Sequence, residues 1–308
     1  MKEILFFLTT VCFVVLSCTK EKTDYEAEID TVVPEYKEFK EAYAINSDGY
    51  KISIEALNGT FYTGYNEVRL EITDSQTNEK VNVSAVTFLP IRTNVDKRNV
   101  SCPHRYDLID KPDDGYFSGY AVFTDRSDAD GSWELYISFT IADQIHTAKQ
   151  DISVHEQANK NMNMAMFEGK DDEQYFIALV SPQKPKVGEN ELVAGIYRFN
   201  KPNNPPSSDF PDASQFSYTE VSDYTLQLDP RMPEPSMGNH SSPNNKDLTQ
   251  RSDGLYHGMV NYTMTGNWTL NFILLNQQGQ ILRGTLVPTD FTPGVEGVKS
   301  ELHIDILF

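Results

Sequence analysis

The chain has very little cysteine and no hydrophobic run long enough to span a bilayer. Only three of its 308 residues are cysteines: Cys12, Cys18 and Cys102. The main apolar stretch, residues 4–16, is shorter than the roughly 20 residues that a membrane-spanning helix needs. Its length is typical of the core of a signal peptide. The sequence therefore predicts a cleaved targeting segment, with which Cys12 leaves.

The predicted signal peptide covers residues 1–17 and ends at a cysteine. Its last residues, Val15-Leu16-Ser17, precede Cys18 in a pattern that resembles the lipobox of bacterial lipoproteins. The resemblance implies a lipid on Cys18 that attaches the protein to a membrane of the bacterial cell envelope. Thr19 favours the outer membrane, because no aspartate follows the cysteine to retain the protein at the inner one. Polar, acidic residues 18–35 are predicted to be a tether.

Basic side chains are scarce. The chain has 26 Lys and Arg against 45 Asp and Glu, which gives a formal net charge of −19. Such a chain repels phosphate backbones, so we expect no nucleic-acid partner. Apart from the lipid anchor, Cys102 is the only cysteine left in the mature chain. We therefore expect no internal disulfide bond.

Helical periodicity is also missing. Most segments alternate polar and apolar residues with period two and are rich in Val, Ile, Tyr, Phe and Thr, as is typical of strands. Turn clusters such as residues 113–115 and 252–254 separate these segments. The pattern predicts an all-β fold of two tandem immunoglobulin-like β-sandwich domains.

The chain contains an internal repeat. Trp133 and Trp268, its two tryptophans, occupy the same place in each copy. Four segment pairs match in the same order: residues 63–74 with 187–199, 83–90 with 222–230, 114–123 with 253–262, and 131–139 with 266–274. We infer a duplication. It predicts one sandwich over residues 36–157 and another over residues 158–308, with residues 200–221 forming a loop inserted in the second copy.

The repeat indicates which side chains face the core. In the second copy, Tyr256, Val260 and Tyr262 share one phase of a strand, and we expect them to be buried. His257 and Met259 have the opposite phase and should point outward. The same reasoning places Tyr116 and Tyr120 of the first copy outward.

Soft metal donors gather in the second copy. The loop before the strand just described holds Met232, Met237 and His240, and the strand itself holds His257 and Met259. Thioether sulfur and imidazole nitrogen suit Cu(I), so these five residues predict a site for copper or another soft cation. The alternative is that the methionines fill gaps in the packing at the end of the sandwich.

The first copy lacks these donors and carries a weaker candidate. Arg92, Lys97 and Val100 stand where the second copy has Met232, Met237 and His240. Nearby, Cys102 and His104 form a Cys-x-His pair that could bind a metal ion. The alternative for this pair is a turn with a semi-buried cysteine.

The loop and strand of the second copy resemble the YtkA-like (FixH-type) domain family. The resemblance rests on residues 184–192, 229–244 and 253–268, although Asn239 interrupts the family's Met-Gly-His element. It extends over most of residues 184–275, and a degenerate version covers residues 60–140. It implies a small β-sandwich in a bacterial envelope, with members linked to metal-cation or copper handling and to oxidase assembly. The composition suits a Bacteroidota lipoprotein.

Two functions remain open, and neither is enzymatic. The first is the binding or trafficking of a soft metal by an envelope protein, including transfer to another envelope protein. The second is a non-enzymatic scaffold that binds a protein or a glycan, for which Tyr116 and Tyr120 would matter most. The sequence has no Gly-x-Ser-x-Gly elbow, no His-Glu-x-x-His pair and no glycine-rich phosphate loop, so we predict no catalytic residues.

Overall fold

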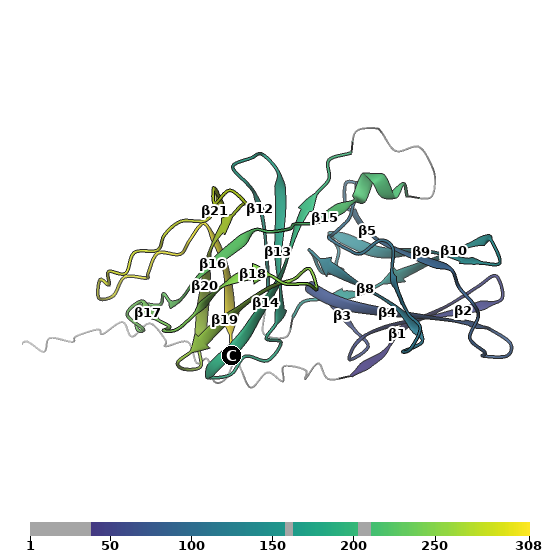
Figure 1. The fold of residues 1–308 in the computed structure, drawn as a ribbon, viewed down its shortest axis with the longest axis horizontal. Helices are drawn as coiled ribbons and strands as arrows, with labels where there is room; N and C mark the ends of the chain where they lie inside the picture. The colour runs from purple at the N-terminus through teal and green to yellow at the C-terminus, as the bar shows by residue number, and fades with distance from the viewer. Residues whose placement is uncertain (1–37, 158–162, 203–210) are drawn as a thin grey trace, which may run out of the picture.

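A computed structural model of the protein describes residues 38–157, 163–202 and 211–308 (Figure 1). Within these ranges the regular structure is β, apart from one short 3₁₀ helix, η1 (Ala213–Phe216). The predicted all-β sandwich fold is therefore confirmed. No helix in the described residues is long and apolar enough to cross a membrane. The predicted signal peptide, Cys18 and the tether lie outside the described residues.

The first half of the chain forms two facing antiparallel sheets. One sheet contains, in order, β1 (Phe39–Ser47), β2 (Tyr50–Leu57), β4 (Gly64–Asp74), β8 (Tyr116–Phe123) and β7 (Ile109–Lys111). The other contains β10 (Gln144–Ile152), β9 (Gly131–Ile141), β5 (Ala85–Asn94) and β6 (Asn99–Val100). A short parallel pair, β3 (Phe61–Tyr62) with β11 (Val154–His155), lies at one end.

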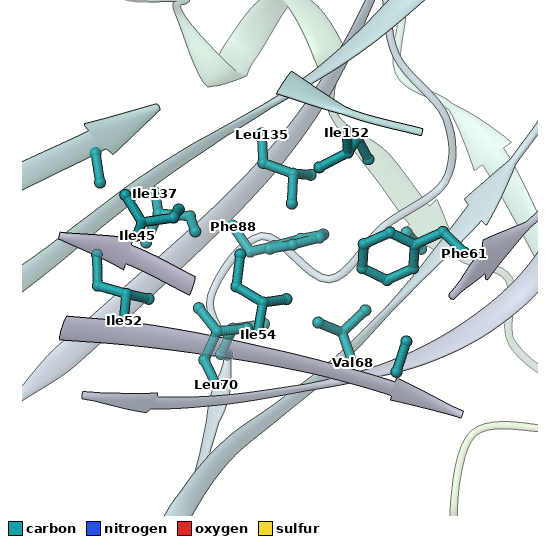
Figure 2. Packing of buried hydrophobic residues seen from close by; sticks show 14 of the residues in the cluster. Ile45, Ile52, Ile54, Phe61, Val68, Leu70, Phe88, Leu135, Ile137 and Ile152 are labelled. Atoms are coloured by element: carbon teal, nitrogen blue, oxygen red, sulfur yellow. The ribbon is translucent and has the colours of Figure 1, made fainter. Parts of the chain in front are cut away.

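The core of this first unit follows from period-two alternation. Strand β4 is buried at every second residue from Gly64 to Ile72, and β9 behaves in the same way. Ile52, Ile54 and Phe88 have no exposed surface, and Figure 2 shows them meeting between the two sheets. Full burial of one such aliphatic side chain stabilises the fold by about 1.5–3 kcal/mol.

The second half forms one continuous sheet that folds over its own core. The order is β12 (Met164–Glu168), β13 (Gln174–Ser181), β14 (Gly188–Phe199), β19 (Tyr256–Tyr262), β18 (Lys246–Gln250), β16 (Thr225–Met232), β20 (Asn267–Leu275) and β21 (Ile281–Arg283). Strands β15 (Tyr218–Glu220), β17 (His240–Ser241) and β22 (Leu302–Leu307) pair with β14, β16 and β20. Because β18 pairs with both β19 and β16, it joins the two layers.

The two units use the same strand register. Gly64 faces Phe123 across β4 and β8, and Gly188 faces Tyr262 across β14 and β19. The second layers match as well, because Pro90 faces Leu135 just as Pro230 faces Leu270. The two hydrophobic cores extend over residues 45–154 and 175–306, inside the two predicted domain ranges. These observations support the duplication, which stays a prediction.

Strand phase follows the expectation in β19 and in β8, but the burial of one outward-facing residue of β8 departs from it. Tyr256, Val260 and Tyr262 have no exposed surface, whereas His257 and Met259 are half-buried on the opposite face. Tyr120, expected in solvent, is only 8% exposed, because the second unit covers it. The predicted loop over residues 200–221 is also partly regular, since it contains η1 and β15.

Candidate functional site

The strand register separates the five predicted metal ligands into two groups. Thr249 of β18 lies opposite Thr225 on one side and opposite His257 on the other, so these two residues are level in the sheet. Met232 follows Thr225 by seven residues on the same strand, which places it roughly 23 Å farther along at about 3.3 Å per residue. His257 and Met232 therefore lie toward opposite ends of the sandwich and are not brought together.

Met232, Met237 and His240 form the first group. Met232 pairs with His240 across β16 and β17, yet its side chain is 2% exposed and belongs to the core. Met237 is partly buried against the same core. The His240 ring lies 6.0 Å from the Trp268 ring, and its Nε2 is 2.8 Å from the Thr263 hydroxyl. For Met232, this burial supports gap filling, the alternative drawn from the sequence.

His257 and Met259 form the second group, and His257 is held by acidic neighbours. Its Nδ1 lies 3.1 Å from Glu191 Oε1, and its Nε2 lies 2.9 Å from Asp253 Oδ2. Burial alone would raise the pKa of Asp253, but the Leu255 N–H and the His257 ring outweigh it and lower that pKa. Each ring nitrogen of His257 lies within hydrogen-bonding distance of a carboxylate, so neither nitrogen is free to bind a metal ion.

The weaker pair, Cys102 and His104, is buried in the first unit. Cys102 has no exposed surface, and burial raises the pKa of its thiol well above the usual range. His104 Nδ1 lies 2.7 Å from the Cys102 carbonyl oxygen, and burial lowers the pKa of the imidazole to about 4. Over the residues that the structure describes, no group of three or more His, Cys, Asp or Glu side chains is arranged to hold a metal ion.

The contact between the two units, which we call the joint, gathers the aromatic side chains that sequence reasoning placed outward or overlooked. Tyr120 and Val122 of β8 pack against Phe176, Ala178 and Tyr197 of β13 and β14 in a small hydrophobic cluster. The Tyr120 ring lies 5.2 Å from the Tyr197 ring, and on its other side it stacks at 5.7 Å on Tyr65. Outer faces of two sheets thus cover each other.

Polar side-chain contacts fix the joint at its edge, and residues of β15 take part in them. Arg105 donates to Glu220 Oε1 at 2.5 Å, and the Tyr120 hydroxyl donates to the same oxygen at 2.9 Å. The Tyr218 hydroxyl donates to the Ser101 carbonyl at 2.8 Å. The segment predicted to be an inserted loop therefore ties the second unit to the first.

Beside these contacts the two units line a hollow of about 160 Å³ that is open to solvent. Its walls combine tyrosines, charged side chains and glycines: Tyr65, Tyr120, Tyr197, Glu67, Arg105, Glu220, Asp253, Gly119, Gly195 and Gly254. This volume is below the range of about 300–1,000 Å³ that is typical of sites for drug-sized molecules, so the hollow suits a small ligand. The sequence signal for this site was the set of aromatic residues on outward strand phases, but their pairing across the units could not be read from it.

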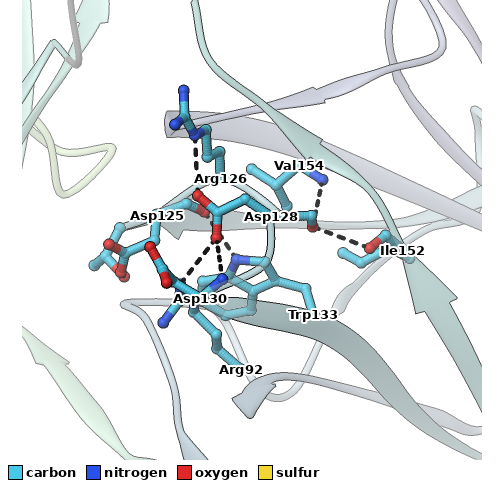
Figure 3. Close-up of polar contacts among 10 residues, drawn as sticks. Arg92, Asp125, Arg126, Asp128, Asp130, Trp133, Ile152 and Val154 are labelled. Carbon is cyan, nitrogen blue, oxygen red and sulfur yellow. Dashed lines mark hydrogen bonds and ion pairs between the residues drawn. The ribbon is translucent and has the colours of Figure 1, made fainter. Parts of the chain in front are cut away.

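A second group of charged residues lies at one end of the first unit (Figure 3). Arg126 donates to Asp128 Oδ2 at 3.1 Å, and this contact is the largest cause that lowers the pKa of Asp128. The Trp133 indole donates to the Asp125 carbonyl, and Ser127 bonds to the main chain at the end of β10. These contacts hold the loop over the end of the sandwich.

Comparisons with known proteins do not extend the functional argument. No family model matches the chain, and a comparison with the sequences of curated proteins gives no match either. A conserved domain protein from Bacillus anthracis is similar in structure, with 11% identity and a TM-score of 0.29 over 90% of this chain and 93% of that one. A DUF4785 family protein from Legionella pneumophila has 10% identity and a TM-score of 0.24 over 76% of this chain and 54% of that one. Neither low score bears on function, and the YtkA-like resemblance stays a prediction.

Proposed function

We propose that the chain is a non-enzymatic binding protein of the bacterial cell envelope, attached through a lipid on Cys18, and that it binds a glycan at the joint. The observation that carries the proposal is the hollow shared by the two units, where tyrosine rings lie beside the partly exposed ion pair of Arg105 and Glu220. Aromatic rings provide apolar faces, and the charged groups provide hydrogen bonds that fix orientation.

The state of the reactive side chains supports a non-enzymatic function. Burial keeps the Cys102 thiol protonated, and a protonated thiol is a poor nucleophile. His104 is buried and bonded to a main-chain carbonyl, so it is not placed to act as a general base on a substrate. The joint, in contrast, offers groups that bind without reacting.

Affinity electrophoresis tests glycan binding at the joint. The full chain is run in native gels that contain a neutral or an acidic polysaccharide, beside its Val122→Asp and Val95→Asp variants. Val122 has no exposed surface and lies in the joint, so a carboxylate there should force the units apart, whereas Val95 is 64% exposed. We expect a polysaccharide in the gel to slow the migration of the wild type and of Val95→Asp. The migration of Val122→Asp should be the same with and without the polysaccharide.

Two outcomes would contradict glycan binding at the joint. One is wild-type migration that no polysaccharide changes, which would leave a protein as the partner to look for. The other is equal retardation of the wild type and Val122→Asp, which would place the binding surface outside the joint.

A second candidate function is soft-metal binding by the smaller set Met232, Met237 and His240. The direct pairing of Met232 with His240, beside the partly buried Met237, favours it. Cu(I) is titrated into the full chain under reducing conditions against a chromophoric chelator. We expect His240→Asn to weaken binding at least tenfold and His257→Asn, at the distant end of the sheet, to leave it unchanged. A wild type that binds no tighter than micromolar would sink this candidate.

A further inference from the structure

The charged groups around the joint hollow come in both signs. Arg105 and Glu220 form an ion pair at the wall, with side chains 32% and 37% exposed. Glu67 and Asp253 add two more carboxylates, which have their own partners in Arg69 and His257. A ligand in this space therefore meets strong donors and strong acceptors at once.

One buried polar group of the hollow lacks a hydrogen-bond partner among the described residues. The Tyr197 hydroxyl accepts and donates no hydrogen bond within residues 38–157, 163–202 and 211–308, although the residue is only 1% exposed. Burying a hydroxyl without a partner costs free energy, and such a group in a folded protein calls for an explanation. Tyr120, its neighbour in the joint, has satisfied its own hydroxyl through Glu220.

Glycine makes room for this hydroxyl at the wall of the hollow. A Cβ at position 195 would collide with Tyr197 Oη, so the ring lies back along β14 over Gly195. Gly195 and Tyr197 both line the hollow. Gly254 lines it too, with a φ of +86° that favours glycine. The main chain can therefore approach a ligand closely here.

The presence of both a guanidinium and carboxylates at the wall favours a ligand without net charge. An anion would suit Arg105 but would face the carboxylates of Glu67, Glu220 and Asp253. A cation would suit those carboxylates but would face Arg105. A neutral ligand with several hydroxyls matches both, because each hydroxyl offers one donor and two acceptors. Its apolar C–H face can lie on a tyrosine ring.

We propose that the joint hollow binds a single neutral sugar ring, with hydroxyls bonded to Glu220, Arg105 and the otherwise unpartnered hydroxyl of Tyr197. This inference rests on the proposed glycan-binding function and adds the site, the charge class and a recognition group. When a buried polar group of a site finds its hydrogen bond only in the ligand, the site binds an analogue without the matching hydroxyl much more weakly.

Amide chemical shifts of the ¹⁵N-labelled full chain test the inference. Glucose, galactose, mannose and N-acetylglucosamine are titrated separately, with glucosamine and glucuronate as the charged counterparts of glucose. We expect at least one neutral sugar to shift the amides of Gly119, Gly195 and Gly254, and to bind more tightly than either charged sugar. Tyr197→Phe should weaken that binding about tenfold without changing the fold.

Tyr262→Phe is the matched control. Tyr262 also has a buried hydroxyl with no partner in the described part of the chain, but it lies in the core of the second unit and away from the hollow. Its loss should leave sugar binding unchanged. The inference is overturned if no neutral sugar shifts the three glycines, if a charged sugar binds more tightly, or if Tyr197→Phe binds like the wild type. Retardation by polysaccharides together with any of these results would leave the proposed function standing and remove only this site.

Discussion

His104 is a residue whose environment should make the protein sensitive to acid. Burial lowers its pKa to about 4, whereas an unfolded chain has a histidine pKa of about 6.5. Below pH 6.5 the unfolded state takes up a proton that the folded state still refuses. The stability is therefore complete above pH 6.5 and falls as the pH drops to about 4, by about 3 kcal/mol in total.

The substitution His104→Asn removes this titration and keeps an amide N–H that can bond to the Cys102 carbonyl. We expect the wild type to lose about 3 kcal/mol more unfolding free energy than His104→Asn between pH 7.5 and pH 4. Urea unfolding at the two pH values measures the difference. His155→Asn, at an exposed position, serves as the control. Equal pH dependence in all three proteins would show that His104 is not a buried neutral group.

At the same scale, the alternation of polar and apolar residues predicted the phase of strand β19 correctly. It placed Tyr256 and Tyr262 inward and His257 outward. It could not predict that Glu191 and Asp253 would hold both nitrogens of His257, because those contacts join another strand and a turn. The presence of a metal-donor side chain in the sequence therefore says little about whether that side chain is available to bind a metal ion.

At the scale of the strand, each unit starts its long strand with the same side-chain clamp. Asn66 accepts from the Tyr62 N–H and donates to the Tyr62 and Gly64 carbonyls. Asn190 makes the same three bonds with Lys186 and Gly188. Gly64 and Gly188 have φ values of +89° and +105°, so the chain turns sharply where the clamp closes.

This shared clamp makes a prediction for both units. Asn66→Ala and Asn190→Ala should each lower the free energy of unfolding of their own unit by about 1–3 kcal/mol, because buried main-chain groups lose their partners. Thermal and urea unfolding measure the loss, and Asn46→Ala at an exposed position of β1 is the control. A large loss for one asparagine and none for the other would speak against equivalent roles in a duplicated fold.

Strand register also explains why the predicted five-ligand metal site did not assemble. Neighbouring segments in a sequence tend to be neighbours in a sandwich, and that expectation brought the loop of Met232 toward His257. In the sheet, β18 lies between β16 and β19 and sets their levels, so His257 is level with Thr225 and far from Met232. The position of β18 depends on its pairing with β16 on one edge and with β19 on the other. The polar and apolar alternation along a single strand does not specify these pairings.

At the scale of the whole molecule, the joint decides how the two sandwiches are related. Because side chains of both units pack together there, the sandwiches are held against each other and not only linked by the chain. Tyr120 and Val122 lie on an outward strand phase, as their spacing predicts, yet they are buried because Phe176 and Tyr197 of the second unit cover them. The comparison of Val122→Asp with Val95→Asp therefore tests this level of structure, since only the first change places a carboxylate between the units.

The sequence by itself determined the all-β class, the division into two cores and the inward face of the main strands. Those features follow from local alternation and from a repeated pattern of glycine, asparagine and tryptophan, which act over a few residues. Only the tertiary structure decided that the outer faces of β8 and β14 cover each other, that Glu220 reaches Arg105, and that the Tyr197 hydroxyl finds no partner among the residues that the structure describes. The physical reason is range, because each of these contacts joins residues about a hundred positions apart or depends on a surface formed by both units.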